Sequence, residues 1–199
     1  MVMTRQHSLS TTFAAFDRAL PEALVSSEAR HRIRAVSETL PVTATDLLYL
    51  ECRLQSDAAQ VDFSIEIASK GRTALSDGDF SRVLATHPYW KRLQTYARRW
   101  SEPQDPIHDL VDSLALEFDL VDEPVPLPGV FFNTYHARPL AASPEWCAAL
   151  VGSIETVIER RLHPRIVENL NRCFDALPAG THVTHAGVFP ARDTEIVRL

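Results

Sequence analysis

The stretch that decides the fold is Asp112-Ser-Leu-Ala-Leu-Glu-Phe-Asp-Leu120, in which apolar and polar residues alternate. Leucine or phenylalanine occupies every second position from Leu114 to Leu120, and Glu117 and Asp119 fall between them. A period of two is typical of a β-strand that turns one face to the core and the other to solvent. The stretch therefore predicts an interior strand with acidic residues on its outer face.

A near copy of this stretch lies upstream, at Asp46-Leu-Leu-Tyr-Leu-Glu-Cys-Arg-Leu54. Both stretches fit the pattern Asp-x-Leu-x-Leu-Glu-x-x-Leu, which aligns Glu51 with Glu117. The leucines alone would match by chance in two buried strands, but the shared Asp and Glu favour a duplicated unit. Such a unit should show the same elements on either side of both copies.

The elements predicted around the two copies do repeat. Apolar spacing, capping residues and prolines predict the order helix, helix, strand, strand in residues 11–68, 79–133 and 144–199. The match in sequence is visible only between the first two of these ranges. We therefore predict an α+β fold of two or three αα-ββ units, with largely antiparallel sheets covered by helices on one side.

The predicted elements follow from these patterns. Helices are expected at 12–20, 22–40, 79–88, 88–100, 143–162 and 164–177, and strands at 46–54, 61–67, 112–120, 130–132, 181–189 and 194–199. The two strands at 46–54 and 61–67 should form a hairpin. We expect residues 1–199 to make a single domain, whose last strand either closes the sheet as an edge or continues beyond the residues given.

Composition excludes several classes of protein. With 199 residues, 45% of them hydrophobic and 23% charged, the chain is typical of globular domains. A formal charge of -6 makes nucleic acid an improbable partner. No apolar run reaches the roughly 18 residues that a membrane-spanning helix needs, so no membrane partner is expected. Three widely spaced cysteines favour buried, reduced thiols and a cytoplasmic location.

The stretch from Asp105 to Glu123 is rich in Asp and Glu and contains no Lys or Arg, which suggests a carboxylate site. If Glu51 and Glu117 project from equivalent strands, they could share acid–base work or hold a hard cation, with His108 and Asp119 nearby. These four residues are the catalytic candidates. The alternative is that alternating acids mark the solvated face of an antiparallel sheet, which the sequence favours.

Aromatic residues suggest a second kind of site. Trp90 lies in a helix that mixes aromatic and basic residues, which would suit an anionic ligand or equally a buried helix with a basic rim. Phe131 and Phe132 follow a proline-rich connection and precede Tyr135 and Arg138, and together they could line a pocket. The alternative is that one phenylalanine enters the core and the other covers the sheet edge.

Motifs for other chemistry are missing from the sequence. His182 and His185 lie three residues apart in a predicted strand, so they should face opposite sides and not share a metal ion. No phosphate-binding or nucleophile motif occurs, and no cofactor is expected. The preferred expectation is a non-catalytic cytoplasmic protein that binds a protein partner or a small molecule through a sheet face or a groove between units. Self-association is left open, and a carboxylate-dependent, hydrolase-like or metal-assisted enzyme is the alternative.

Overall fold

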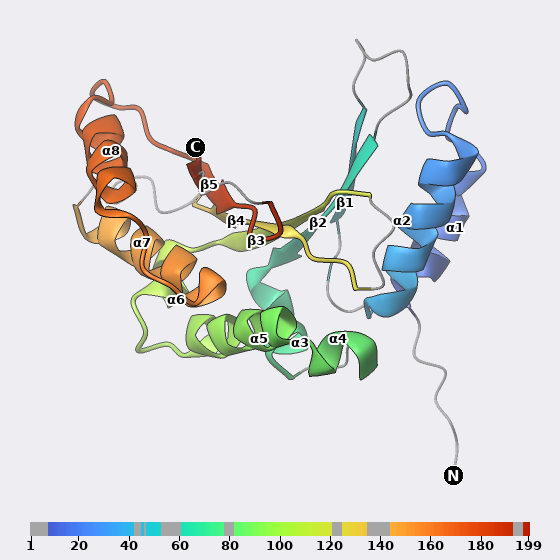
Figure 1. Cartoon of the computed structure of the whole chain (residues 1–199), viewed down its shortest axis with the longest axis horizontal. Helices are drawn as coiled ribbons and strands as arrows, with labels where there is room; N and C mark the ends of the chain where they lie inside the picture. The colour runs from blue at the N-terminus through green and yellow to red at the C-terminus, as the bar shows by residue number, and fades with distance from the viewer. Residues whose placement is uncertain are drawn as a thin grey trace.

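The structure is a computed structural model that describes residues 8–41, 45, 47–52, 61–77, 82–120, 125–134, 144–192 and 197–199 (Figure 1). In these residues the strands form one six-stranded antiparallel sheet in which neighbours in the chain are neighbours in the sheet. The strands are β1 (Leu47–Cys52), β2 (Val61–Ala68), β3 (Ser113–Phe118), β4 (Gly129–Asn133), β5 (His185–Val188) and β6 (Val197–Arg198). The predicted α+β class and antiparallel sheet are confirmed.

The helices precede each pair of strands. They are α1 (Leu9–Asp17), α2 (Ser27–Thr39), α3 (Arg72–Asp77), α4 (Arg82–Thr86), α5 (Pro88–Ser101), α6 (Ile107–Leu110), α7 (Pro144–Ile158) and α8 (Pro164–Asp175), and a 3₁₀ turn covers Ser69–Gly71. The order is therefore two helices and two strands, then four helices and two strands, then two helices and two strands. No helix in the described ranges is both long and apolar enough to span a bilayer.

Local sequence explains where the main helices begin. Ser26 caps α2, because its hydroxyl oxygen accepts a hydrogen bond of 3.2 Å from the amide of Ala29. Both α5 and α8 begin at the proline of a His-Pro pair, where the missing amide proton of proline costs nothing. In each case the histidine ring, of His87 or His163, accepts a hydrogen bond from the amide two residues later.

One face of the sheet is the core. Leu114, Leu116 and Phe118 of β3 are at most 1% exposed, as the alternation predicts. Helix α5 packs against this face and buries Trp90 and Trp100 completely. Figure 1 shows α3 and α5 beneath the sheet and α1 and α2 beside β1. The opposite face carries none of the described helices, so residues at the alternate strand positions lie on an open face.

The strand in the last third is shorter than predicted. The sequence predicts residues 181–189, whereas β5 covers only His185–Val188. Its partner β4 ends at Asn133, and one further bond, from the Thr134 amide to the Thr184 carbonyl at 2.9 Å, is the last pairing on that side. At the edge of the sheet, Val197 and Arg198 pair with β5 as β6.

Candidate functional site

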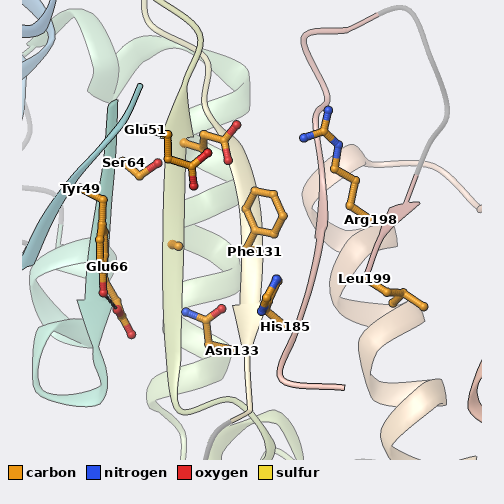
Figure 2. Close-up of a pocket in the computed structure, with 11 residues that line it drawn as sticks. Tyr49, Glu51, Ser64, Glu66, Phe131, Asn133, His185, Arg198 and Leu199 are labelled. Atoms are coloured by element: carbon orange, nitrogen blue, oxygen red, sulfur yellow. Dashed lines mark hydrogen bonds between the residues drawn. The ribbon is translucent and has the colours of Figure 1, made fainter. Parts of the chain in front are cut away.

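The open face of the sheet carries a shallow hollow of about 390 Å³ (Figure 2). We call it the open-face hollow. Its lining comes from all six strands and from the residue after β6: Tyr49, Glu51, Ser64, Glu66, Ala115, Glu117, Phe131, Asn133, His185, Arg198 and Leu199.

Strand register brings Glu51 and Glu117 to the same face. Glu51 lies opposite Asp62 of β2, and Glu117 lies opposite Ser64 of the same strand. Asp62 and Ser64 are two residues apart, so they share a face, and so do their partners. The two glutamates that the sequence pattern aligns therefore both line the open-face hollow, two strands apart.

Glu117 is the most buried carboxylate of the hollow. It is 9% exposed and makes no hydrogen bond or ion pair with any residue in the described ranges. Burial raises its pKa above the ordinary value of 4.5, and the negative charges of Glu51 and Asp62 raise it further. Arg198 and Arg192 oppose this shift without compensating for it. An added cation beside Glu117 would restore part of the stabilisation that the carboxylate loses through its partial burial.

Glu66 is held differently from Glu117. Its carboxylate accepts a hydrogen bond of 2.6 Å from the hydroxyl of Tyr49 and another from the hydroxyl of Ser113. The Ser113 oxygen in turn accepts a bond of 2.9 Å from the side-chain amide of Asn133. This network fixes Glu66 in place as a hydrogen-bond acceptor. The sequence alone does not indicate this network, because four separate strands supply its members and only their register brings them together.

Aromatic rings form the apolar part of the hollow. A Cβ added at Gly187 would come within 2.3 Å of the Phe131 ring, and one added at Gly129 within 2.5 Å of the Phe189 ring. Both rings therefore lie directly against glycine backbone, an arrangement that protects the backbone of a strand glycine. Phe131 also meets Phe189 and His185 edge to face, at centroid distances of 5.6 and 6.1 Å.

Asp119 lies beside the hollow but not in its lining. Its two carboxylate oxygens accept hydrogen bonds of 2.6 and 2.9 Å from Arg192, whose guanidinium stacks 3.7 Å from the centre of the Phe189 ring. A two-point Arg–carboxylate pair is among the strongest of surface contacts. The structure thus uses Asp119 to anchor Arg192, whereas Glu51 and Glu117, the two other carboxylate candidates, form no such pair with the residues that the structure describes.

His108 does not join the carboxylates. It lies in α6, on the helical side of the sheet, and is not part of the lining of the hollow. Its ring contacts Arg72, at 2.9 Å from Nδ1 and 3.1 Å from Nε2, and the Trp100 carbonyl, at 3.1 Å from Nδ1. Arg72 in turn stacks 4.6 Å from the centre of the Trp100 ring. The surroundings of His108 are therefore those of a packing residue.

Of the aromatic candidates that the structure describes, Phe131 lines the hollow and Trp90 and Phe132 do not. Trp90 is fully buried and its indole nitrogen donates a bond of 3.0 Å to the Pro126 carbonyl, so no ligand reaches it. Phe132 is 1% exposed and packs edge to face against Tyr96. The two remaining candidates, Tyr135 and Arg138, lie outside the described residues.

The cysteines and histidines offer no metal site within the described ranges, where no three His, Cys, Asp or Glu side chains converge. Cys147 is buried, and burial raises the pKa of its thiol. The expectation of three buried thiols is wrong for Cys173, which is exposed on the outer face of α8, and Cys52 is only half-buried. Leu170 and Phe174 supply the buried stripe of that helix instead.

Comparisons of the chain with protein-family models, with curated proteins and with solved structures found no match.

Proposed function

We propose that this protein binds a small ligand in the open-face hollow and that Glu117 holds a cationic group of that ligand. The observation that carries the proposal is the burial of Glu117 without a cationic partner among the described residues. A buried charge without a partner costs free energy of folding, and binding sites commonly retain such a cost for the sake of function.

The surroundings of Glu117 favour an ammonium or a guanidinium over other groups. Glu51 and Glu66 line the same hollow and add negative charge, which attracts a cation and repels an anion. The ring faces of Phe131 and Tyr49 suit the apolar part of such a ligand and also attract cations. A neutral ligand would supply no charge to stabilise the Glu117 carboxylate, so the free-energy cost of burying that carboxylate would remain.

The size of the hollow favours a small molecule. Ligand pockets usually occupy about 300–1,000 Å³, and the open-face hollow lies near the lower limit. A lysine or arginine side chain of a protein partner would present the same cationic group. In that case Leu47, which is 46% exposed on β1, would add apolar contact beside the hollow, next to Tyr49 of its lining.

Two features indicate which partner class is disfavoured and in which compartment the protein would act. Negative charge in the hollow disfavours nucleic acid, whose phosphates would be repelled. Three free cysteines, of which Cys173 is exposed, favour a reducing compartment, and we place the protein in the cytoplasm on that basis.

The proposal is tested by NMR titration of the ¹⁵N-labelled protein with hexylamine, with hexanol as the uncharged counterpart. Hexylamine should shift the amide signals of Ser64, Glu117 and Phe131, and hexanol should shift them far less. The Glu117→Gln variant should weaken hexylamine binding by about tenfold or more, because it removes a desolvated charge contact.

The control is Glu168→Gln, which removes the same charge from the exposed face of α8. It should leave the affinity for hexylamine within about twofold of wild type, since screened distant charges contribute little. Equal binding of hexylamine and hexanol, or equal losses in the two variants, would contradict the proposal.

An enzyme that uses carboxylates is the second candidate, and one observation favours it. Glu117 has a raised pKa beside a second carboxylate, Glu51, on the same face, which is the arrangement of an acid–base pair. Such an enzyme should hydrolyse some member of a panel of chromogenic glycosides and esters, and Glu117→Gln should abolish that turnover. The binding proposal predicts no turnover above the level of the variant.

A further inference from the structure

Arg198 lies on the opposite side of the hollow from the strands that carry the glutamates. It belongs to β6 at the edge of the sheet and pairs with Gly187 of β5. Its side chain is exposed, and its guanidinium stacks 4.6 Å from the centre of the Phe189 ring. Among the described residues it forms no ion pair. Arg192, by contrast, is fully engaged by Asp119.

Arg198 and Glu117 influence each other without touching. The positive charge of Arg198 lowers the pKa of Glu117, so the two groups are close enough to interact electrostatically. Yet no ion pair forms, because their strands β3 and β6 are three strand separations apart, about 14 Å between backbones. Figure 2 shows Arg198 and Glu51 at opposite sides of the hollow, with Phe131 between them.

The floor between the two charges is apolar. Phe131 lies against Gly187 and is held edge to face by Phe189 and His185, so its position is well defined. A ligand that spans the hollow would cross this ring with an uncharged segment. A purely cationic ligand would leave Arg198 unused, and a purely anionic ligand would meet the carboxylates of Glu51, Glu66 and Glu117.

We infer that the hollow takes an amphoteric ligand, a short chain with an ammonium held at Glu117 and a carboxylate held at Arg198. An uncharged stem lies across Phe131. This inference rests on the proposed function, because Glu117 holds the cationic group in both. An ω-amino acid and a short peptide with free ends share this chemistry, and they differ in whether the stem carries amide groups.

Calorimetry on the full chain tests the inference with pairs of probes that differ by one carboxylate. The probes are the ω-amino acids from glycine to 8-aminooctanoate, each compared with the alkylamine of the same length. At the best length the amino acid should bind at least about tenfold more tightly than the amine, because a second charge is paired. Triglycine then shows whether amide groups in the stem are accepted.

The variant Arg198→Gln should abolish the preference for the amino acid, and it should bind the amine at least as tightly as wild type does, because it removes a positive charge from the neighbourhood of Glu117. Arg198→Lys should restore part of the preference. The matched control is Arg165→Gln on the exposed face of α8, which should change neither affinity.

The outcomes separate the two proposals. If amines bind but no amino acid binds better at any length, or if the preference survives in Arg198→Gln, the amphoteric ligand is refuted while the cation site at Glu117 stands. If neither probe binds to the wild-type protein, the cation site itself is refuted.

Discussion

Glu117 places a carboxylate where the fold gives it little compensation. The strand pattern that puts Leu116 and Phe118 in the core turns Glu117 to the other face, where it is 9% exposed and pairs with Gly129, the glycine covered by the Phe189 ring. Nearby charges do not balance it, since the carboxylates of Glu51 and Asp62 outweigh the influence of the arginines. Because the ionised Glu117 side chain lowers the free energy of unfolding, the binding proposal can be tested by measuring the stability of Glu117 variants.

Replacing Glu117 by Gln should stabilise the protein at neutral pH. The amide keeps the shape of the side chain and removes the charge, so the free energy of unfolding should rise by about 1 kcal/mol. For a chain of this size the melting temperature should rise by about 3 °C. Thermal unfolding followed by circular dichroism measures the change, and a melting temperature lower than that of wild type would count against an unpaired buried charge.

The same substitution should show a defined dependence on pH. Since burial, Glu51 and Asp62 raise the pKa of Glu117 and Arg192 and Arg198 only oppose the shift, the folded protein binds this proton more tightly than the unfolded chain does. Wild-type stability should therefore fall, relative to Glu117→Gln, as pH rises from about 4.5 to the raised pKa, and the difference should stay constant above it. Urea unfolding at a series of pH values measures the difference. A gap that narrows as pH rises through that window would contradict the assignment.

Replacing His108 should destabilise the protein, in contrast to replacing Glu117. The substitution His108→Ala removes contacts to Arg72 and to the Trp100 carbonyl, so the free energy of unfolding should fall by about 1–2 kcal/mol. Hexylamine affinity, measured by the same NMR titration, should not change. A loss of affinity without a loss of stability would return His108 to the functional site.

The strands of the open face depend on two glycines covered by aromatic rings. Gly187 lies under Phe131 in the strand beside β4, and an added Cβ would overlap the ring near its attached end, where it cannot swing away easily. This contact holds Phe131 as the floor of the hollow. It also explains why glycine, which weakens a strand by itself, occurs within β5.

The substitution Gly187→Ala should therefore destabilise the protein by about 1–3 kcal/mol, because it overpacks the contact with Phe131. Gly152→Ala is the matched control, since an added Cβ there has no atom within 4 Å and the residue lies inside α7. The control should stabilise by about 0.5–1 kcal/mol, as alanine favours helices. Urea unfolding measures both, and changes of the same sign would refute the packing argument.

At the scale of elements, the sequence predicts what local pattern determines. The helix at Pro88–Ser101 follows from a proline at its first position and a regular apolar stripe, and the hairpin of β1 and β2 follows from alternation. Glu51 and Glu117 lie on one face of the sheet because each occupies an outward-facing position in the alternating pattern of its strand, and the register of β1, β2 and β3 aligns these positions. Tyr49, Glu66 and Arg198 could not be assigned to one site, since strand register across the sheet depends on contacts distant in sequence.

The short helices α3 and α6 were not predicted, for a related reason. Each has six residues or fewer, which is too short for a helical period to be recognised in the sequence. Arg72 at the start of α3 and His108 in α6 then meet through tertiary packing over Trp100. The contact between Arg72 and His108 produces no recognisable pattern in the sequence, so the sequence alone could not show that His108 is a packing residue.

The whole molecule joins its three pairs of strands in one sheet, and hydrogen bonds donated by helix side chains link the predicted units. Arg32 of α2 donates a hydrogen bond of 2.6 Å to the Leu120 carbonyl after β3, and Arg92 of α5 donates one of 2.9 Å to the Val157 carbonyl of α7. These bonds cross the boundaries between the predicted units. Whether the units arose by duplication stays a prediction, but such contacts favour folding as one body.

We therefore predict a single cooperative unfolding transition. Trp90 and Trp100 report on α5, and Trp146 reports on α7, all three being almost fully buried. In the Trp146→Phe variant, fluorescence follows only α5, and its urea midpoint should coincide with that of far-UV circular dichroism. Two separated midpoints would show that the units unfold independently.

The measurement that tests the central claim most directly is an NMR titration of the Glu117 side-chain carboxyl carbon, with and without saturating hexylamine. The account predicts a pKa above the ordinary 4.5 in the free protein and a lower pKa in the complex, because the bound cation stabilises the ionised form. An ordinary pKa in the free protein, or a raised pKa that hexylamine leaves unchanged, would contradict the claim that Glu117 is a buried carboxylate that binds a cation.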